Sequence, residues 1–410
     1  MNIRKTVEKH LRSSADFLKE IILIPSVSGT GEGPVQDYIQ KAWSSFGKAD
    51  LVPVPENFTE DPEYSFADTP LDYSNRKNLV LRYPSKEKGP SLIINSHSDV
   101  VPPGDWKEAW NPREENGIIH GRGACDAKGQ VAVMDLALKT LHEIAPSVAG
   151  NLSFQVVIEE EVGGNGALAM VRQEKKADGV IVLEPTDLKL HPANRGAIWY
   201  RLDVEGKPVH MARIWDGVNA LEKTVELMKV MREYEKGLIE ESRHVPLFEK
   251  YRQPVQLNFG IISGGKWPAT VCDHITMEGG VGFLPNKTLA QIKQELHDAL
   301  ASCPDQWAAS HFTLSFPKLH NDAFATDISH PLVVQMAETA KTVGLDPELS
   351  GWIASCDARL YARLGNMPTI VFGAGKLEDA HSAVEKIEIN DIAKAAEMLV
   401  TFLLQWFKEE

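Results

Sequence analysis

Residues 91–102 read SLIINSHSDVVP, and this stretch decides the fold. Its first six residues form a short apolar run between turn-forming residues, which is typical of a buried β-strand. A similar run, NLVLRY, occupies residues 78–83. His97 and Asp99 follow directly on the first run. The sequence therefore predicts a buried strand with potential ligands at its carboxyl end.

Further strands and helices alternate along the chain around this stretch. Apolar runs of the same kind occupy residues 152–158, 179–183 and 368–373. Residues 7–22 and 128–143 instead place apolar side chains at the spacing of one helical face. This alternation predicts a sheet between two layers of helices. The expected fold class is α/β, with a mixed-sheet catalytic domain that helices cover on both faces.

The pattern changes after Pro192. Apolar and polar residues alternate strictly over residues 198–204, which indicates a strand with one buried face and one wet face. The elements that follow have the order β-α-β-β-α-β over ~120 residues, the order of a ferredoxin-like α+β unit. Beyond it Asn390 is expected to cap a terminal helix. We predict one domain from residues 1–192 and 319–410, into which residues 193–318 are inserted.

Composition excludes several classes of partner. The 410 residues include 43 basic and 57 acidic ones, and the resulting charge of −14 repels nucleic acid and anionic membranes. The four cysteines are too scattered for a disulfide framework. Neither a signal peptide nor an apolar run of the ~18 residues that a membrane span needs is apparent. We expect a cytoplasmic protein that binds neither nucleic acid nor membrane.

Residues of ligand type lie at or just beyond the ends of predicted buried strands, where open α/β sheets build their sites. They are His97, Asp99, Asp126, Glu160, Glu161, Glu184 and His381. Taken singly, such a histidine is typical of a structural hydrogen bond, and a run of glutamates is typical of a solvated surface. Taken together, they would repel one another or lose solvation unless cations neutralised them. We therefore expect a metal site at this sheet edge.

The ligand types indicate two metal ions. Nitrogen and oxygen donors suit Zn²⁺, with Co²⁺ or Mn²⁺ as alternatives. Asp126 is the expected bridge, because its glycine-rich flanks permit close approach. His97 and Glu184 would complete one site, and Glu161 and His381 would complete the other. Asp99 would accept the second N–H of the His97 imidazole and thereby fix its tautomer.

The motifs PSVSG, HSDVVP, GRGACDAKG, EEEVGG, EPT, GKPVH, GVNA, GG and AHSAVE follow one another along nearly the whole chain. In this order they resemble the dizinc amidohydrolases that include acetylornithine deacetylase, succinyl-diaminopimelate desuccinylase, glutamate carboxypeptidase and aminoacylase. The resemblance implies the same five metal ligands and Glu160 as the general base. It also implies that residues 193–318 are a lid and dimerisation domain. His210 would reach the oxygen of the scissile carbonyl, often in the partner subunit's site.

The expected function is hydrolysis of the amide bond of a small N-acyl amino acid or a related amide. A water that bridges two cations has a lowered pKa, so a neighbouring carboxylate can take its proton. Glu160 would be that general base, and it points away from Glu161 if the two residues continue a strand. A dipeptidase or carboxypeptidase of the same family would share these residues. A non-catalytic binding relative is the alternative from another class. The expected assembly is a homodimer through the lid domain.

Substrate recognition is where this chain departs from the family that it resembles. Ala269 and Gly282 stand where an asparagine and an arginine of the lid commonly hold a substrate carboxylate. Arg359 is the first candidate replacement, and the alternative is a surface or interface arginine paired with Asp357. Further candidates for substrate binding are Arg195, as a second cation, and Gly375, whose turn would let backbone N–H groups approach the substrate. Cys125 is expected to be a packed thiol.

Overall fold

A large sheet forms the centre of the computed structural model, which describes residues 2–65, 71–173 and 176–408. Its strands follow the order β1-β2-β6-β3-β7-β16-β8-β14, and β15 also pairs with β8. The bounds are β1 (Lys48–Pro53), β2 (Lys77–Arg82), β3 (Ser85–His97), β6 (Val148–Val157), β7 (Gly179–Leu183), β8 (Leu190–Asn194), β14 (Phe324–Ala325), β15 (Leu349–Trp352) and β16 (Thr369–Phe372). The neighbours β6, β3, β7 and β16 run parallel, so their carboxyl ends share one edge.

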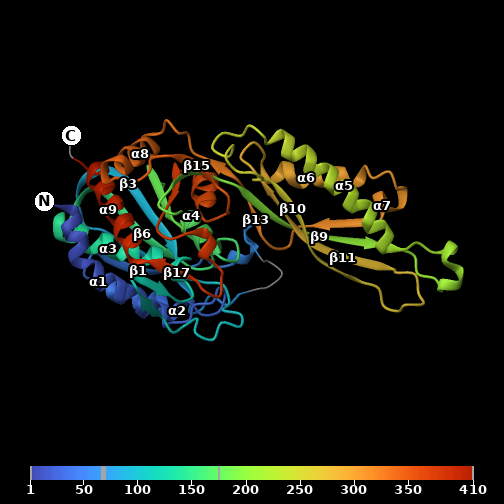
Figure 1. Cartoon of the computed structure of the whole chain (residues 1–410), viewed down its shortest axis with the longest axis horizontal. Helices are drawn as coiled ribbons and strands as arrows, with labels where there is room; N and C mark the ends of the chain where they lie inside the picture. The colour runs from blue at the N-terminus through green and yellow to red at the C-terminus, as the bar shows by residue number, and fades with distance from the viewer. Residues whose placement is uncertain (1, 66–70, 174–175, 409–410) are drawn as a thin grey trace.

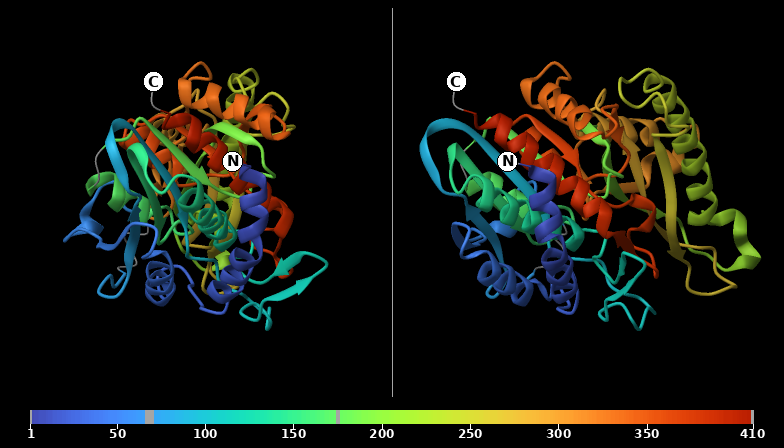
Figure 2. Two further views of the ribbon diagram at one scale, coloured as in Figure 1. Left: turned by 90° about the vertical axis from the view of Figure 1, so that its left-hand side faces the viewer. Right: turned by 60° about the vertical axis from the view of Figure 1, so that its left-hand side comes forward.

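Helices cover both faces of the large sheet. On one face, α1 (Ile3–Ile22), α3 (Lys128–Ile144) and α9 (Ile389–Trp406) pack against one another, as the blue and red helices of Figure 2 show. On the other face lie α4 (Asn165–Gln173) and the single turn η3 (Leu360–Leu364). Successive residues of a strand join the two different cores, because neighbouring side chains of a strand point to opposite faces. The predicted α/β fold with a doubly covered mixed sheet is confirmed.

A second sheet extends beyond the first, so that the molecule is elongated (Figure 1). We call its strands the lid sheet: β9 (Gly196–Glu205), β10 (Gln256–Gly264), β11 (His274–Phe283), β12 (Phe312–Ser315) and β13 (His320–Asn321). The order β10-β11-β9-β12 and the antiparallel pairings are those of a ferredoxin-like unit. The predicted boundaries of the inserted domain stay a prediction.

Helices pack on only one face of the lid sheet. They are α5 (Ala220–Glu241), α6 (Leu289–Ala301) and the short α7 (Gln306–Ser310). Leu227 and Met231 of α5 and Leu296 of α6 share one buried core with Tyr200 and Leu202 of β9. The opposite face, which carries Trp199, has no helix over it in the part of the chain that the structure describes. The predicted one-sided sheet is therefore present.

A small third sheet brings the end of the chain back to the large domain. It pairs β17 (Lys386–Glu388) with β5 (Ile118–His120), which also pairs with β4 (Arg113–Glu115). The predicted cap of the last helix is wrong, because α9 begins at Ile389 and Asn390 lies within its first turn. The backbone N–H of Ile389 donates to the Gly117 carbonyl instead (2.9 Å), so the hairpin satisfies this helix end.

Two further helices, α2 (Glu32–Trp43) and α8 (Pro331–Val343), pack into the same core as α1, α3 and α9. The remaining elements are the short 3-10 segments η1 (Phe58–Glu60), η2 (Met211–Asp216) and η4 (Leu377–Asp379). Within the described ranges, no helix has both the length and the apolar character that crossing a membrane would require.

Candidate metal centre

The predicted ligands gather at the edge where the parallel strands end. His97 is the last residue of β3, and Glu184 directly follows the neighbouring strand β7. Asp126 lies in the segment between β5 and α3, and its peptide bond to Ala127 is cis. Ligand atoms of these three buried residues all lie within 4.8 Å of one another. Such a spacing allows all three side chains to bind one ion.

A second group of three shares one member with the first. Ligand atoms of Asp126, Glu161 and His381 also lie within 4.8 Å of one another. The Oδ1 atom of Asp126 is 3.2 Å from Nε2 of His97, and its Oδ2 atom is 3.2 Å from Nε2 of His381. Nε2 of His381 is also 3.0 Å from Oε2 of Glu161. Each oxygen of Asp126 thus belongs to a different group, as a bridging carboxylate requires.

The electrostatics of the cluster favour bound cations. Burial raises the pKa of Glu160 and Glu184 well above the ordinary value, and it raises the pKa of Glu161 to about 7. Carboxyl groups so close together ionise fully only where positive charge offsets their desolvation and mutual repulsion. The donor set consists of imidazole nitrogens and carboxylate oxygens, which fit Zn²⁺, Co²⁺ or Mn²⁺. The residues present therefore suit a pair of divalent ions.

Asp99 contacts more groups than the sequence predicts. Nδ1 of His97 lies 3.4 Å from Oδ1 of Asp99 and 3.0 Å from the Asp99 backbone oxygen, so the expected contact is present. The two carboxylate oxygens also accept the backbone N–H groups of Glu160 and Glu161, each at 3.1 Å. Burial opposes ionisation, but the hydrogen bonds and His97 hold the pKa of Asp99 below its ordinary value. Asp99 thus orients both the histidine and the glutamate pair.

The glutamate pair does not continue a strand, so the condition on which the opposite orientation of Glu160 and Glu161 was inferred is not met. Strand β6 ends at Val157, and Glu159 has a positive φ of 60°. The carbonyl of Glu160 accepts N–H groups from Gly163 (2.9 Å) and Gly164 (3.1 Å), which closes a turn. The turn forms because one acceptor, Asp99, binds two successive N–H groups, which a strand would direct to opposite sides.

A buried network holds this turn, and the sequence analysis missed it. Arg76 donates to Glu32 (2.7 Å) and also to Glu159. Glu159 accepts further hydrogen bonds from the Tyr73 hydroxyl (2.7 Å) and from the Asn165 amide (3.0 Å). Glu159 is fully buried, although a run of three glutamates usually marks a surface. Nothing in the sequence joins it to Arg76, which lies 83 positions away.

We expect Arg76→Leu to destabilise the protein, because it leaves the carboxylates of Glu32 and Glu159 buried and unpaired. The loss is about 3–5 kcal/mol of unfolding free energy, measured by urea unfolding. Arg12→Leu is the matched control, since Arg12 pairs with Asp16 and Glu114 on the surface and should leave the midpoint nearly unchanged. Equal midpoints for the two variants would contradict a stabilising role for the Arg76 network.

Glu385, a second residue that was not predicted from the sequence, positions Asp126, which both groups of candidate ligands share. Glu385 is buried and accepts the backbone N–H groups of Cys125 and Asp126, each at 2.9 Å. Arg122 in turn donates to Glu385 (2.7 Å). The sequence contains a signal for Glu385, because this residue ends the same AHSAVE motif that contains His381. The Cys125 thiol is buried against the Lys376 carbonyl, as a packed thiol should be.

The predicted substrate residues lie in different surroundings. Arg359 is only 2% exposed and donates to the Gly163 carbonyl (2.7 Å), so the alternative of a surface arginine is wrong. Its role as a substrate anchor stays a prediction. Gly375 is buried with a φ of 77°, in the loop that leads to His381. Arg195 lies at the start of the lid sheet.

His210 directly precedes η2, in the segment between β9 and α5. This green segment lies at the end of the lid that is farthest from the large sheet (Figure 1). The side chain is exposed, and its Nδ1 accepts the backbone N–H of Ala212 (3.1 Å). Because Nδ1 is the acceptor, the proton of a neutral imidazole resides on Nε2, which is then a free donor.

Comparisons with known proteins find relatives of this chain. The family described as Peptidase family M20/M25/M40 matches residues 93–405. A probable carboxypeptidase of Arthroderma benhamiae is 31% identical over 376 residues, which cover 87% of this chain and 79% of the relative. The N-formyl-4-amino-5-aminomethyl-2-methylpyrimidine deformylase of Bacillus subtilis is 26% identical over 346 residues, which cover 77% and 79% of the two chains.

Solved structures share the whole architecture. A tripeptidase from Staphylococcus aureus has a TM-score of 0.76 at 18% identity, and the match covers 97% of this chain and 99% of the tripeptidase. The large domain and the lid sheet are therefore both part of a known fold.

Proposed function

The chain belongs to peptidase family M20/M25/M40, whose members hydrolyse amide or peptide bonds, and from this premise we propose a dinuclear metal enzyme that deacylates small N-acyl amino acids or related amides. The observation that carries the proposal is the position of Asp126, which belongs to both groups of potential ligands. A carboxylate that binds a single ion belongs to one group of ligands. A carboxylate that bridges two ions must belong to the ligand groups of both ions.

The chain offers a set of ligands for each ion. His97 and Glu184 would hold one ion and Glu161 and His381 the other, with Asp126 between them. We propose Zn²⁺ as the native metal, with Co²⁺ or Mn²⁺ as alternatives, because the donors are nitrogen and oxygen. Two such ions would polarise the scissile carbonyl and lower the pKa of a water molecule.

Glu160 is the proposed general base. Its backbone N–H is fixed by Asp99, and the next residue is a metal ligand, so its carboxylate is held beside the ions without being needed to bind them. Glu160 takes a proton from the attacking water as the oxygen bonds to the carbonyl carbon. It then returns this proton to the nitrogen as the C–N bond breaks, so that the carboxylic acid and the free amine leave.

His210 is the proposed donor to the developing oxyanion, and we propose that a second copy of the chain supplies it. Nδ1 accepts a backbone N–H, which leaves Nε2–H as the donor, but the segment between β9 and α5 that carries His210 lies at the far end of the lid from the large sheet of its own chain (Figure 1). Strand β10 is an edge of the lid sheet and exposes Ile261 (60%) and Ile262 (52%). Exposed apolar edges favour pairing, so residues 193–318 are the proposed dimer interface.

We expect His210→Ala to lower kcat by about 100-fold, because one oxyanion donor contributes on the order of 3 kcal/mol to the transition state. Co-expression of this variant with Glu160→Gln then tests the dimer. In a mixed dimer, one site combines the intact Glu160 of one subunit with the intact His210 of the other. Amine release by mixed dimers well above that of either variant alone is the expected result.

Mixed dimers as inactive as the two parents would place His210 in its own subunit's site. Sedimentation of the wild type gives an independent check, since a strictly monomeric active enzyme would remove the argument for a histidine from a partner.

A dipeptidase or carboxypeptidase is the second candidate function, because one relative at 31% identity is named a probable carboxypeptidase. The residues proposed so far serve both reactions. Amine release from a panel of N-acyl amino acids and dipeptides, together with elemental analysis for metal, separates the candidates. Turnover of dipeptides alone would replace the deacylase proposal, and a protein with neither metal nor turnover would be a binding relative.

A further inference from the structure

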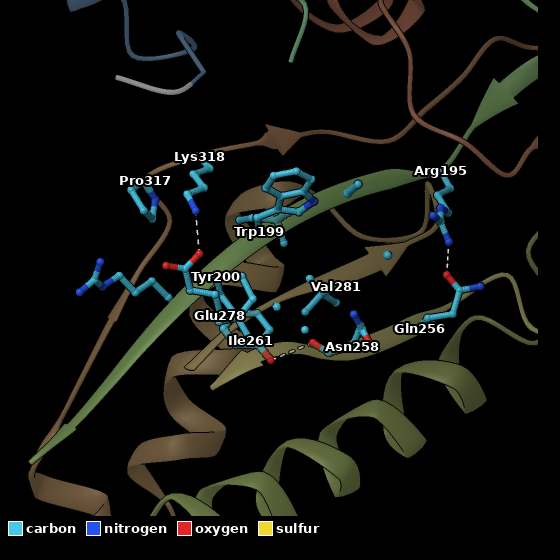
Figure 3. Close-up of a pocket in the computed structure, with 17 residues that line it drawn as sticks. Arg195, Trp199, Tyr200, Gln256, Asn258, Ile261, Glu278, Val281, Pro317 and Lys318 are labelled. Carbon is cyan, nitrogen blue, oxygen red and sulfur yellow. Dashed lines mark hydrogen bonds and ion pairs between the residues drawn. The ribbon is translucent and has the colours of Figure 1, made fainter. Parts of the chain in front are cut away.

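A groove of about 400 Å³ opens on the uncovered face of the lid sheet, across β9, β10 and β11 (Figure 3). Part of its floor is bare backbone, because Gly280 and Gly282, which pair with Trp199 and Ala197 of β9, contribute no side chains there. The indole of Trp199 stands beside this floor and is 44% exposed. The volume lies within the range of sites that bind small molecules, about 300–1,000 Å³.

The two ends of the groove differ in charge. At one end Lys318 pairs with Glu278 (2.7 Å), so the two charges offset each other (Figure 3). At the other end Arg195 donates to the neutral amide of Gln256, and its Nε atom is buried without a hydrogen-bond partner. Among the described residues, no carboxylate forms an ion pair with Arg195. Burial of a guanidinium beside neutral groups is costly, and an anion would offset that cost.

Gly282 makes room for this cation. A Cβ atom at position 282 would lie 2.9 Å from Nη1 and 3.1 Å from Cζ of Arg195, so the guanidinium would have to shift from its present place. Any larger residue there would displace the guanidinium. The glycine and the arginine therefore act together to place a positive charge at the end of the groove.

Arg195 also connects the groove to the catalytic domain. Its backbone N–H donates to the carbonyl of Trp352 (3.0 Å) in β15. Its side chain lines a second pocket together with Ala354 and with Leu377, which lies four residues before the metal ligand candidate His381. The positive charge thus lies where the large sheet passes into the lid sheet, between β8 and β9.

We propose that this groove is a binding site for an aromatic carboxylic acid, in which Arg195 binds the carboxylate and the ring lies on the glycine floor beside Trp199. The planar guanidinium of an arginine can donate two parallel hydrogen bonds to a carboxylate. A groove floor without side chains lets an aromatic ring lie against the backbone. Given the proposed function, the natural ligand is an N-acyl aromatic amino acid. Binding itself does not depend on the metals.

Calorimetry on the intact, chelator-treated protein tests the site without catalysis. The probes are N-acetyl-phenylalanine, its amide and N-acetyl-alanine. We expect the acid to bind about tenfold or more tightly than the amide, because a charged hydrogen-bonded pair is lost in the amide. N-acetyl-alanine should bind weakly because it leaves the glycine floor empty. Equal affinities for acid and amide, or no binding, would overturn the proposal.

Three variants assign the interaction to its residues. Arg195→Lys should abolish the preference for the acid, whereas Arg201→Lys, at a groove arginine that is paired with Asp203, should keep it. Gly280→Val should remove binding of N-acetyl-phenylalanine, since an added side chain would occupy the groove beside Trp199, whose Cδ1 lies 3.4 Å from a Cβ placed at position 280. Circular dichroism confirms folding of each.

The outcomes separate this proposal from the proposed function. Equal losses from Arg195→Lys and Arg201→Lys would show that the groove merely attracts anions and would overturn the site. Normal binding without amide hydrolysis in the metal-loaded protein would leave the site standing and overturn the proposed function. Binding that disappears as the protein dimerises would assign the groove to a second copy of the chain instead.

Discussion

Glu160→Gln is expected to lower kcat by about 10³-fold while the protein keeps both metal ions and its KM. The glutamine has the same shape but cannot accept a proton, and general acid–base catalysis contributes typically 10²–10⁴-fold. The metal ligands stay in place because Asp99 binds the backbone of residue 160, which the substitution does not change. Steady-state amine release and elemental analysis on the same preparation measure both parts of the prediction.

Glu161→Gln is the matched comparison one residue away. It should lose metal, because Glu161 lies within ligand distance of Asp126 and His381. The opposite pattern, in which Glu160→Gln loses metal and Glu161→Gln keeps two ions, would reverse the roles assigned to the pair.

Asp126→Ala is expected to lose both ions together, and with them activity falls by at least about 10³-fold. Each group of potential ligands contains Asp126, so its removal leaves two ligands for either ion. Glu184→Gln is the control, since Glu184 belongs to one group only and its loss should release a single ion. Elemental analysis and circular dichroism on both variants distinguish metal loss from unfolding. Two retained ions in Asp126→Ala would contradict its bridging position.

Much of the fold follows from local patterns. Apolar runs such as residues 91–96 need burial on both faces, whereas the alternation over residues 198–204 permits only one buried face. These two patterns separate the large sheet from the lid sheet without any tertiary information. The ligand edge follows as well, because parallel strands bring their carboxyl ends together.

Short helices with mixed faces were not apparent from the sequence. Helix α2 begins with Glu32, Gly33 and Pro34 after Gly31, and it has no side-chain cap. Its place is set by contacts with β1 and β2 rather than by its own pattern. Tertiary packing therefore decides where such a helix forms.

The details of the site depend on contacts between distant residues. The turn at Glu159 forms because Asp99, Arg76 and Asn165 bind its groups from three different segments. The link between Arg195 and Gly282 joins two strands that are neighbours only through β-pairing. Sequence spacing contains no information on such contacts, so the gathering of the candidate ligands at one edge was predictable, whereas the contacts of Arg76 and Asn165 with Glu159 were not.

Metal reconstitution tests the dinuclear site most directly. Protein freed of metal by a chelator is titrated with Zn²⁺, Co²⁺ or Mn²⁺, and bound metal and amine release from an N-acyl amino acid are followed together. The predicted result is no activity without metal and saturation of both signals at two ions per chain. Full activity of the metal-free protein, saturation at one ion, or restoration by none of the three metals would contradict it.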